Sequence, residues 1–177
     1  MATYSLRDMV RTPNLISLAR LPLAVAFPWI VRQRRWPIPW LTLAAATDVL
    51  DGWYARTFHE ETATGAALDA VMDKAFVLTV VATLVHERML TLFDAFLLET
   101  RDLGEIPLLL RAAARHEGPS APRSSNVAGK AVTVLQFATL VATLSSMSRR
   151  RGWVLATGAC GVFAAATYWI REARAAR

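Results

Sequence analysis

The stretch TDVLDGWYARTFHEETATGAALDAVMDKAF, residues 47–76, places Asp48, Asp51, Asp69 and Asp73 between two strongly apolar runs. On both sides the chain is apolar enough to lie inside a lipid bilayer. A charged side chain at the centre of a membrane helix costs about 2.5–3.5 kcal/mol on insertion scales. Four carboxylates in such a segment therefore call for a partner or a function.

The whole chain is more apolar and less charged than an ordinary soluble domain. Its 177 residues are 54% hydrophobic and 19% charged, whereas soluble domains carry about 25% charged residues. A compact bundle of membrane helices fits this composition better. The single cysteine, Cys160, excludes both a disulfide framework and a cysteine metal site.

The net charge of +6 comes from arginine clusters that lie between apolar runs. A nucleic-acid surface would need one basic stripe with interleaved aromatic residues, so we predict no binding to nucleic acid. Basic clusters that flank apolar segments are typical of contact with anionic lipid headgroups. With both termini inside, nine arginines lie on the inner side and seven on the outer side, which favours a cytoplasmic N-terminus.

Six runs of the chain approach the roughly 20 apolar residues that a membrane span requires. They cover residues 13–32, 36–57, 63–86, 89–111, 127–148 and 152–171. Helices are expected rather than strands, because every backbone group must be hydrogen-bonded within lipid and the runs are rich in leucine and alanine. We predict an all-α integral membrane bundle of six transmembrane helices, forming a single domain over residues 1–177.

Residues 1–12 lack the order of charged, apolar and cleavage regions that marks a signal peptide. We expect them to form a short amphipathic segment at the membrane surface.

The four aspartates fall at helical spacings. Asp48 and Asp51 are three residues apart near the end of the second run, and Asp69 and Asp73 are four apart near the start of the third. Each pair therefore projects from one helix face. Because the segment between them turns the chain round, the two helices should run antiparallel and bring all four carboxylates to one membrane edge.

Oxygen-rich clusters without histidine suit hard divalent cations such as Mg²⁺ or Mn²⁺. Two such ions are a recurring arrangement for displacement at phosphorus. The alternative is that the aspartates are solvated or paired with Arg56 and Lys74. Gly52, Ala55 and Gly65 are small residues beside the aspartates, where either a ligand or a neighbouring helix could approach closely.

The pattern Asp48-x2-Asp51-Gly52-x2-Ala55-Arg56-x8-Gly65-x3-Asp69-x3-Asp73 resembles the complete signature of the CDP-alcohol phosphotransferase family. The resemblance implies transfer of a phosphoryl-containing group from a CDP-linked donor to an alcohol, with release of CMP. It implies that the four aspartates bind two divalent metal ions and that Asp73 is the base on the acceptor hydroxyl. The cytidine diphosphate would be held by Gly52, Ala55, Arg56, Gly65 and Asp69.

Three shorter motifs resemble phosphatidylglycerophosphate synthases and CMP-forming cardiolipin synthases. They are TPNLISLAR (12–20), TRD (100–102) and GKAVTVLQ (129–136). They imply a CDP-diacylglycerol donor and a glycerol-type acceptor.

Two cations in the second half, Arg101 and Lys130, are expected to bind an acceptor phosphate, because a cation inside a membrane usually faces a cavity and pairs with an anion. An ion pair of Arg101 with Asp102, Glu105 or Asp94 is the alternative. The side chain of Arg20, in the first run, could instead reach the interface by snorkelling.

We therefore predict an enzyme of phospholipid synthesis in the cell inner membrane, with its active site facing the cytoplasm. The expected acceptor is glycerol 3-phosphate, and the close alternative is phosphatidylglycerol, as in a cardiolipin synthase. The resemblance also implies a homodimer. The alternative from another class is a membrane cation carrier, which would need a path to both sides of the bilayer, whereas these aspartates are expected at one edge.

Overall fold

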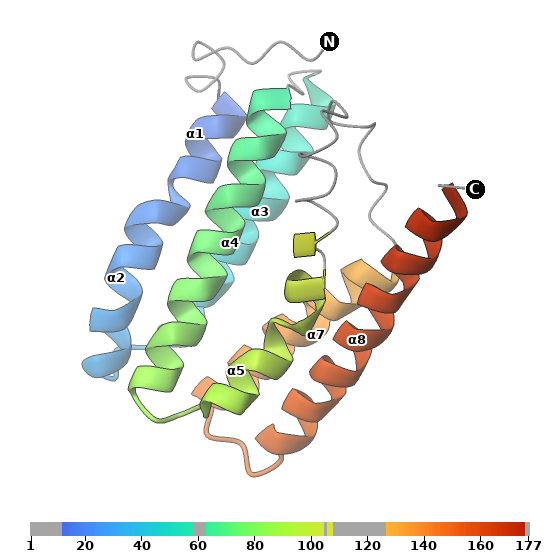
Figure 1. Cartoon of the computed structure of the whole chain (residues 1–177). Helices are drawn as coiled ribbons and strands as arrows, with labels where there is room; N and C mark the ends of the chain where they lie inside the picture. The colour runs from blue at the N-terminus through green and yellow to red at the C-terminus, as the bar shows by residue number, and fades with distance from the viewer. Residues whose placement is uncertain (1–11, 59–62, 105, 108–126, 176–177) are drawn as a thin grey trace. The chain divides into compact units, whose positions relative to one another are not determined.

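The computed structural model describes residues 12–58, 63–104, 106–107 and 127–175, and within these ranges the chain forms helices and no strand. The predicted all-α class is confirmed. The chain divides into two compact units, Met1–Arg88 and Met89–Arg177, coloured from blue to green and from yellow-green to red in Figure 1. Apart from Thr12, the amphipathic segment predicted at the N-terminus lies outside the described residues.

The first unit holds four helices. They are α1 (Thr12–Leu18), α2 (Arg20–Arg32), α3 (Pro37–Thr57) and α4 (Ala63–His86). α1 packs against α3 and α4, and α2 packs against the same two helices. The core of the first unit contains Phe27 and Phe76, whose rings meet edge to face with centroids 6.3 Å apart.

The first predicted helix, residues 13–32, is interrupted at Ala19. Pro22 has no backbone N–H to donate to the carbonyl of Leu18, so one bond of the helical ladder is missing at this point. The amide of Ala19 still bonds the carbonyls of Leu15 and Ile16, each at 3.1 Å. A single residue, Ala19, therefore separates α1 from α2.

α3 begins at a well-defined stop in the chain. Trp36 precedes it in the left-handed conformation, with φ of 49°, and Pro37 follows at the first helical position, where its missing N–H costs nothing. α3 ends and α4 begins at the same end of the unit (Figure 1), so the two helices run antiparallel, as predicted. This arrangement brings the end of α3 that carries Asp48 and Asp51 beside the start of α4.

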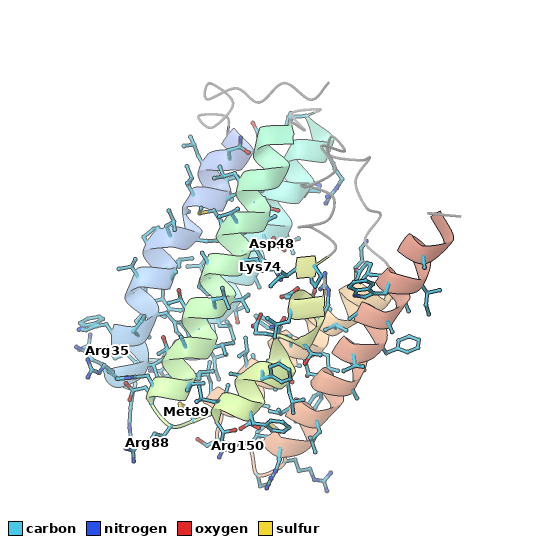
Figure 2. The ribbon with its side chains drawn as sticks, in the orientation of Figure 1. Arg35, Asp48, Lys74, Arg88, Met89 and Arg150 are labelled. Atoms are coloured by element: carbon cyan, nitrogen blue, oxygen red, sulfur yellow. The ribbon has the colours of Figure 1, made fainter. Side chains whose placement is uncertain are left out.

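The second unit contains α5 (Leu92–Leu98), α7 (Val127–Leu144) and α8 (Arg150–Ala175). α8 packs against both α5 and α7. Thr91 and Asp94 form a capping box at the start of α5, in which each side chain accepts a hydrogen bond from the other residue's amide. Arg150, the first residue of α8, donates to the carbonyl of Met89 at 2.9 Å, and both residues are labelled in Figure 2.

The prediction of one helix over residues 89–111 was wrong in part. α5 ends at Leu98, Glu99 lies in a turn, and helical structure resumes at residues 100–104. The hydroxyl of Thr100 donates to the carbonyls of Phe96 and Leu97, at 3.0 and 2.9 Å. Such side-chain bonds compete with the backbone ladder and commonly bend a helix.

Small residues allow close packing within the second unit. A Cβ added to Gly104 would lie 2.6 Å from the Cβ of Ala165 on α8, and one added to Gly158 would lie 2.9 Å from Leu97. Both distances are too short for real carbon contacts. Backbones can therefore approach at these points only because the side chains are missing.

We expect Gly104→Ala to destabilise the protein by about 1–3 kcal/mol, because the added methyl group meets Ala165 rather than a flexible side chain. Gly152→Ala is the matched control, since its Cβ would meet nothing within 4 Å and alanine favours a helix by about 0.5–1 kcal/mol. Thermal unfolding of the purified protein in detergent measures both. Equal melting temperatures for the two variants would contradict the close contact.

The described helices bury polar side chains and expose apolar ones. Thr139, Thr143 and Thr157 are fully buried, and the hydroxyls of Thr139 and Thr157 are 2.7 Å apart between α7 and α8. Large apolar side chains such as Val25 and Leu92 are at the same time 79% and 78% exposed. Large exposed apolar side chains beside buried hydroxyls suit an apolar surrounding for these helices.

Among the described residues, two helical segments, Asn14–Arg32 and Arg150–Arg171, are long and apolar enough to cross a membrane, judged by length and composition. The predicted six spans are not confirmed. α3 and α4 have 21 and 24 residues, but they carry the aspartates that lower their apolar content. In α7 the apolar helix Gly129–Leu144 is shorter than a span.

Candidate active site

Three aspartates from two helices meet around one arginine in the first unit. Arg20, the first residue of α2, pairs with Asp48 and Asp51 of α3 and with Asp69 of α4. Its Nη2 lies 3.0 Å from Asp48 Oδ1 and 2.7 Å from Asp51 Oδ2, and its Nη1 lies 2.8 Å from Asp69 Oδ1. We call the three aspartates the carboxylate cluster.

Ser17 adds a neutral donor to the same group. Its hydroxyl donates to Asp51 Oδ2 at 2.6 Å and lies 3.4 Å from Asp69 Oδ1. Ser17 and Arg20 are three residues apart, so both side chains lie on one face where α1 meets α2. The first helical segment is therefore fixed to α3 and α4 through polar contacts at the cluster.

The carboxylate cluster is closed on one side and open on the other. Arg20 is 1% exposed and Asp51 is 4% exposed, whereas Asp48 and Asp69 are 50% and 41% exposed. The guanidinium therefore forms the inner wall, and two of the carboxylates face outward. One oxygen from each of the three aspartates lies within 4.8 Å of the others, a spacing that could hold a metal ion.

Asp73 lies one helical turn beyond Asp69 on α4 and is half-buried. It is not one of the three residues whose oxygens share the 4.8 Å group, but it is close enough to Asp48 and Asp69 to interact with both electrostatically. Lys74 follows it on the same helix, and Figure 2 labels Lys74 together with Asp48 on neighbouring α3. The structure thus brings all four predicted aspartates to one region of the first unit.

The residues expected to hold the cytidine diphosphate lie around the same helix ends. Arg56 is exposed, and its guanidinium covers Gly52, where an added Cβ would lie 3.2 Å from Arg56 Nη1. Gly65 is buried in the first turn of α4. Ala55 lies on α3 one residue before Arg56. Gly52 therefore faces a side chain of its own helix rather than a neighbouring helix.

The two residues expected at the acceptor site belong to the second unit. Arg101 Nη1 donates to the carbonyl of Gly129 at 3.0 Å and to the hydroxyl of Thr133 at 2.8 Å, both on α7. Lys130, the next residue after Gly129, is exposed. A Cβ on Gly129 would collide with the hydroxyl of Tyr168 and would be in ordinary contact, at 3.5 Å, with Arg101 Cζ, so this glycine makes room for the Tyr168 hydroxyl.

For Arg20 the structure differs from the alternatives weighed for the cations. Arg20 does not snorkel to an interface, because its guanidinium is buried among three carboxylates. Arg20 pairs with Asp48, Asp51 and Asp69, a cation that the alternative of Arg56 and Lys74 did not include. The rule that a cation in an apolar helix pairs with an anion would have found Arg20.

Comparison with known proteins gives the class. The CDP-alcohol phosphatidyltransferase family matches residues 10–170 of the chain, a range that includes the carboxylate cluster and every residue of the signature. The chain belongs to this family, and it is an enzyme of phosphatidyl transfer.

The relatives of the chain include enzymes with two different names. The chain is 29% identical to a cardiolipin synthase (CMP-forming) of Streptomyces coelicolor over 162 residues, which cover 86% of this chain and 73% of that protein. It is 38% identical to a CDP-diacylglycerol–glycerol-3-phosphate 3-phosphatidyltransferase of Cereibacter sphaeroides over 71 residues, or 37% of this chain and 32% of that protein. A protein of the same name from Pseudomonas fluorescens is 37% identical over 83 residues, or 42% of this chain and 41% of that protein.

Proposed function

We propose that the chain transfers a phosphatidyl group from CDP-diacylglycerol to the hydroxyl of a glycerol-type acceptor and releases CMP, as a step of phospholipid synthesis. The observation that carries this proposal is the meeting of Asp48, Asp51 and Asp69 around Arg20 within a chain of this family. Glycerol 3-phosphate is the acceptor we propose first. Phosphatidylglycerol is the second candidate, because the relative whose alignment covers 86% of this chain is named as a cardiolipin synthase.

The residues of the cluster fit a hard divalent cation. All three aspartates offer oxygen, and one oxygen from each lies within 4.8 Å of the others, the ligand type that Mg²⁺ and Mn²⁺ prefer. A carboxylate can accept about four hydrogen bonds or metal contacts, so the contact with Arg20 leaves capacity for a metal. We propose Asp48, Asp51, Asp69 and Asp73 as the ligands of two such ions.

When bound, these ions would offset the negative charge of the diphosphate and of the departing CMP. Residues of the chain would bind and orient the donor. Arg56, exposed beside Gly52, is placed to bind a diphosphate oxygen with its guanidinium. We propose that it orients the donor together with Gly52, Ala55, Gly65 and Asp69.

Asp73 is the base in this proposal. The acceptor oxygen forms a bond to the phosphatidyl phosphorus, its proton passes to a carboxylate oxygen of Asp73, and the bond from that phosphorus to CMP breaks. Asp73 lies one turn away from Asp69 and outside the 4.8 Å group, which supports a second role for it beside that of metal ligand. A carboxylate has two oxygens, so one can hold an ion while the other takes the proton of the acceptor.

We also propose that the chain is a multi-pass protein of the cell inner membrane, with six spans in one domain over residues 1–177 and its active site facing the cytoplasm. Buried threonines and exposed apolar side chains support a lipid environment for the described helices. The helices α3 and α4 measure about 31 and 36 Å at 1.5 Å per residue, which is enough for a bilayer core of about 30 Å. A homodimer completes the proposal.

The test is to supply purified protein with CDP-diacylglycerol labelled in its acyl chains and with either glycerol 3-phosphate or phosphatidylglycerol. Labelled phosphatidylglycerophosphate, with CMP in equal amount, is the expected product. Labelled cardiolipin from phosphatidylglycerol, with no product from glycerol 3-phosphate, would replace the first acceptor by the second. Absence of CMP release with both acceptors would contradict the proposed function.

A second arm of this experiment uses Arg101→Ala. If Arg101 binds the acceptor phosphate, the KM for glycerol 3-phosphate should rise about 10- to 100-fold, as expected for loss of a charge-assisted hydrogen bond, while the KM for CDP-diacylglycerol stays nearly unchanged. Thr133→Val is the matched control, because it removes the hydroxyl that accepts from Arg101 but keeps the guanidinium. Equal KM changes in both variants would assign Arg101 to packing against α7.

A further inference from the structure

Arg20 is the most deeply buried charged residue in the part of the chain that the structure describes. Its side chain is 1% exposed, against 4% for Asp51 and 8% for Glu99. A buried guanidinium without partners would be strongly unfavourable, and removing one partner of a buried ion pair typically destabilises a protein more than the pair itself stabilises it. Arg20 and the aspartates around it therefore depend on one another.

The contacts divide the guanidinium among the three carboxylates. Nη2 serves both aspartates of α3, and Nη1 serves the aspartate of α4. One rigid, planar group thus sets the distance between two helices at the point where the proposed metal ligands lie. Arginine suits this task because its donors have a fixed geometry and its charge is permanent.

The charge of the cluster is also informative. Three carboxylates at −1 and one guanidinium at +1 leave a net charge of −2 when all are ionised. With Asp73, the fourth proposed ligand, the net charge is −3, so Arg20 offsets only part of the negative charge that the two proposed ions would meet. Without Arg20 the same carboxylates would repel one another with only solvent or a metal ion to compensate them.

The exposed sides of Asp48 and Asp69 lie away from Arg20. They are 50% and 41% exposed, whereas the guanidinium is almost completely covered. A metal ion that arrives from the exposed side can bind carboxylate oxygens without displacing the arginine from the inner wall.

We propose that Arg20 is a built-in counter-cation of the carboxylate cluster, which positions Asp48, Asp51 and Asp69 and keeps the first unit folded whether or not a divalent ion is bound. The inference rests on the proposed metal site and goes beyond it by assigning a positioning residue. It follows that a chain without this cation depends on a divalent ion for its stability.

The experiment measures the apparent Tm of the full-length protein in detergent, once in EDTA and once in Mn²⁺, for the wild type, Arg20→Gln and Arg20→Lys. Arg32→Gln is the matched control. Arg32 lies on the same helix, but its side chain is 68% exposed and its ion pair with Glu87 is long, at 3.5 Å. Exposed pairs of this kind contribute little to stability.

In EDTA, Arg20→Gln should lower the Tm by roughly 10 °C, as expected for a broken buried ion pair in a protein of this size. The rise in Tm on adding Mn²⁺ should be about twice that of the wild type or more, because the metal then supplies the missing positive charge. For Arg20→Lys, which keeps the charge, both the Tm in EDTA and the rise in Tm on adding Mn²⁺ should lie between those of the wild type and Arg20→Gln. Arg32→Gln should match the wild type in both conditions.

Equal Mn²⁺ increments in the wild type and Arg20→Gln would overturn the inference, because a residue that serves only packing loses the same stability with and without metal. A Mn²⁺ increment of zero in both would instead overturn the metal site itself. If Arg20→Gln can be purified only in Mn²⁺, the inference is supported. If it cannot be purified in either condition, Arg20→Lys decides, and a Mn²⁺ increment no larger than that of the wild type overturns the inference.

Discussion

Asp73→Asn is expected to lower the rate of CMP release by about 10²- to 10⁴-fold, the range that a general base contributes. Asparagine keeps the size of the side chain but cannot take the proton of the acceptor hydroxyl. Because Asp48, Asp51 and Asp69 keep their three-oxygen group in this variant and asparagine still offers an oxygen ligand, binding of CDP-diacylglycerol should change by less than about threefold. The effect should therefore appear in kcat and not in the dissociation constant of the donor.

Single-turnover CMP release and equilibrium binding of CDP-diacylglycerol together measure these two quantities. Glu87→Gln is a suitable control, since Glu87 is a carboxylate of the same unit that pairs with exposed Arg32 and should leave the rate unchanged. Near-wild-type turnover by Asp73→Asn would remove Asp73 from the role of base. Loss of donor binding would show that it belongs to the donor site.

Chelation of divalent metal is expected to stop CMP release completely, and Mg²⁺ or Mn²⁺ should restore it. With Arg20 as their partner, three ionised aspartates keep a net charge of −2, and the diphosphate of the donor adds further negative charge. Without a metal these groups repel one another, and the donor cannot bind productively.

The measurement compares CMP release in EDTA with release in EDTA that has been saturated with Mg²⁺ beforehand. The second condition controls for effects of the chelator on detergent and lipid. Undiminished release after thorough chelation would contradict the proposed metal site.

Helix positions followed from the sequence because each apolar run is long and bounded by turn residues. Residues 37–57 and 63–86 are helical almost as predicted. The breaks at Ala19 and Glu99 were not predicted, since each depends on a single residue. Pro22 lacks the amide hydrogen for one helical bond, and the hydroxyl of Thr100 donates to backbone carbonyls of the preceding turn. Apolar content alone does not report such local competition.

The candidate site was predictable where its residues follow helical spacing. Asp48 and Asp51, and Asp69 and Asp73, are each within one turn, so sequence alone places each pair on one face. The pairing with Arg20 joins residues that are 28, 31 and 49 positions apart. Only the packing of α2 against α3 and α4 brings them together, and no local pattern encodes that distance.

The one-sided exposure of the carboxylate cluster bears on transport. A cation that entered between Asp48 and Asp69 would meet the guanidinium of Arg20 directly behind them, covered to 99% by protein since only 1% of it is exposed. A fixed positive charge at that depth is an electrostatic barrier to any second cation. Such a charge opposes onward passage of an ion past the carboxylates, and this geometry suits chemistry at the exposed side rather than ion conduction.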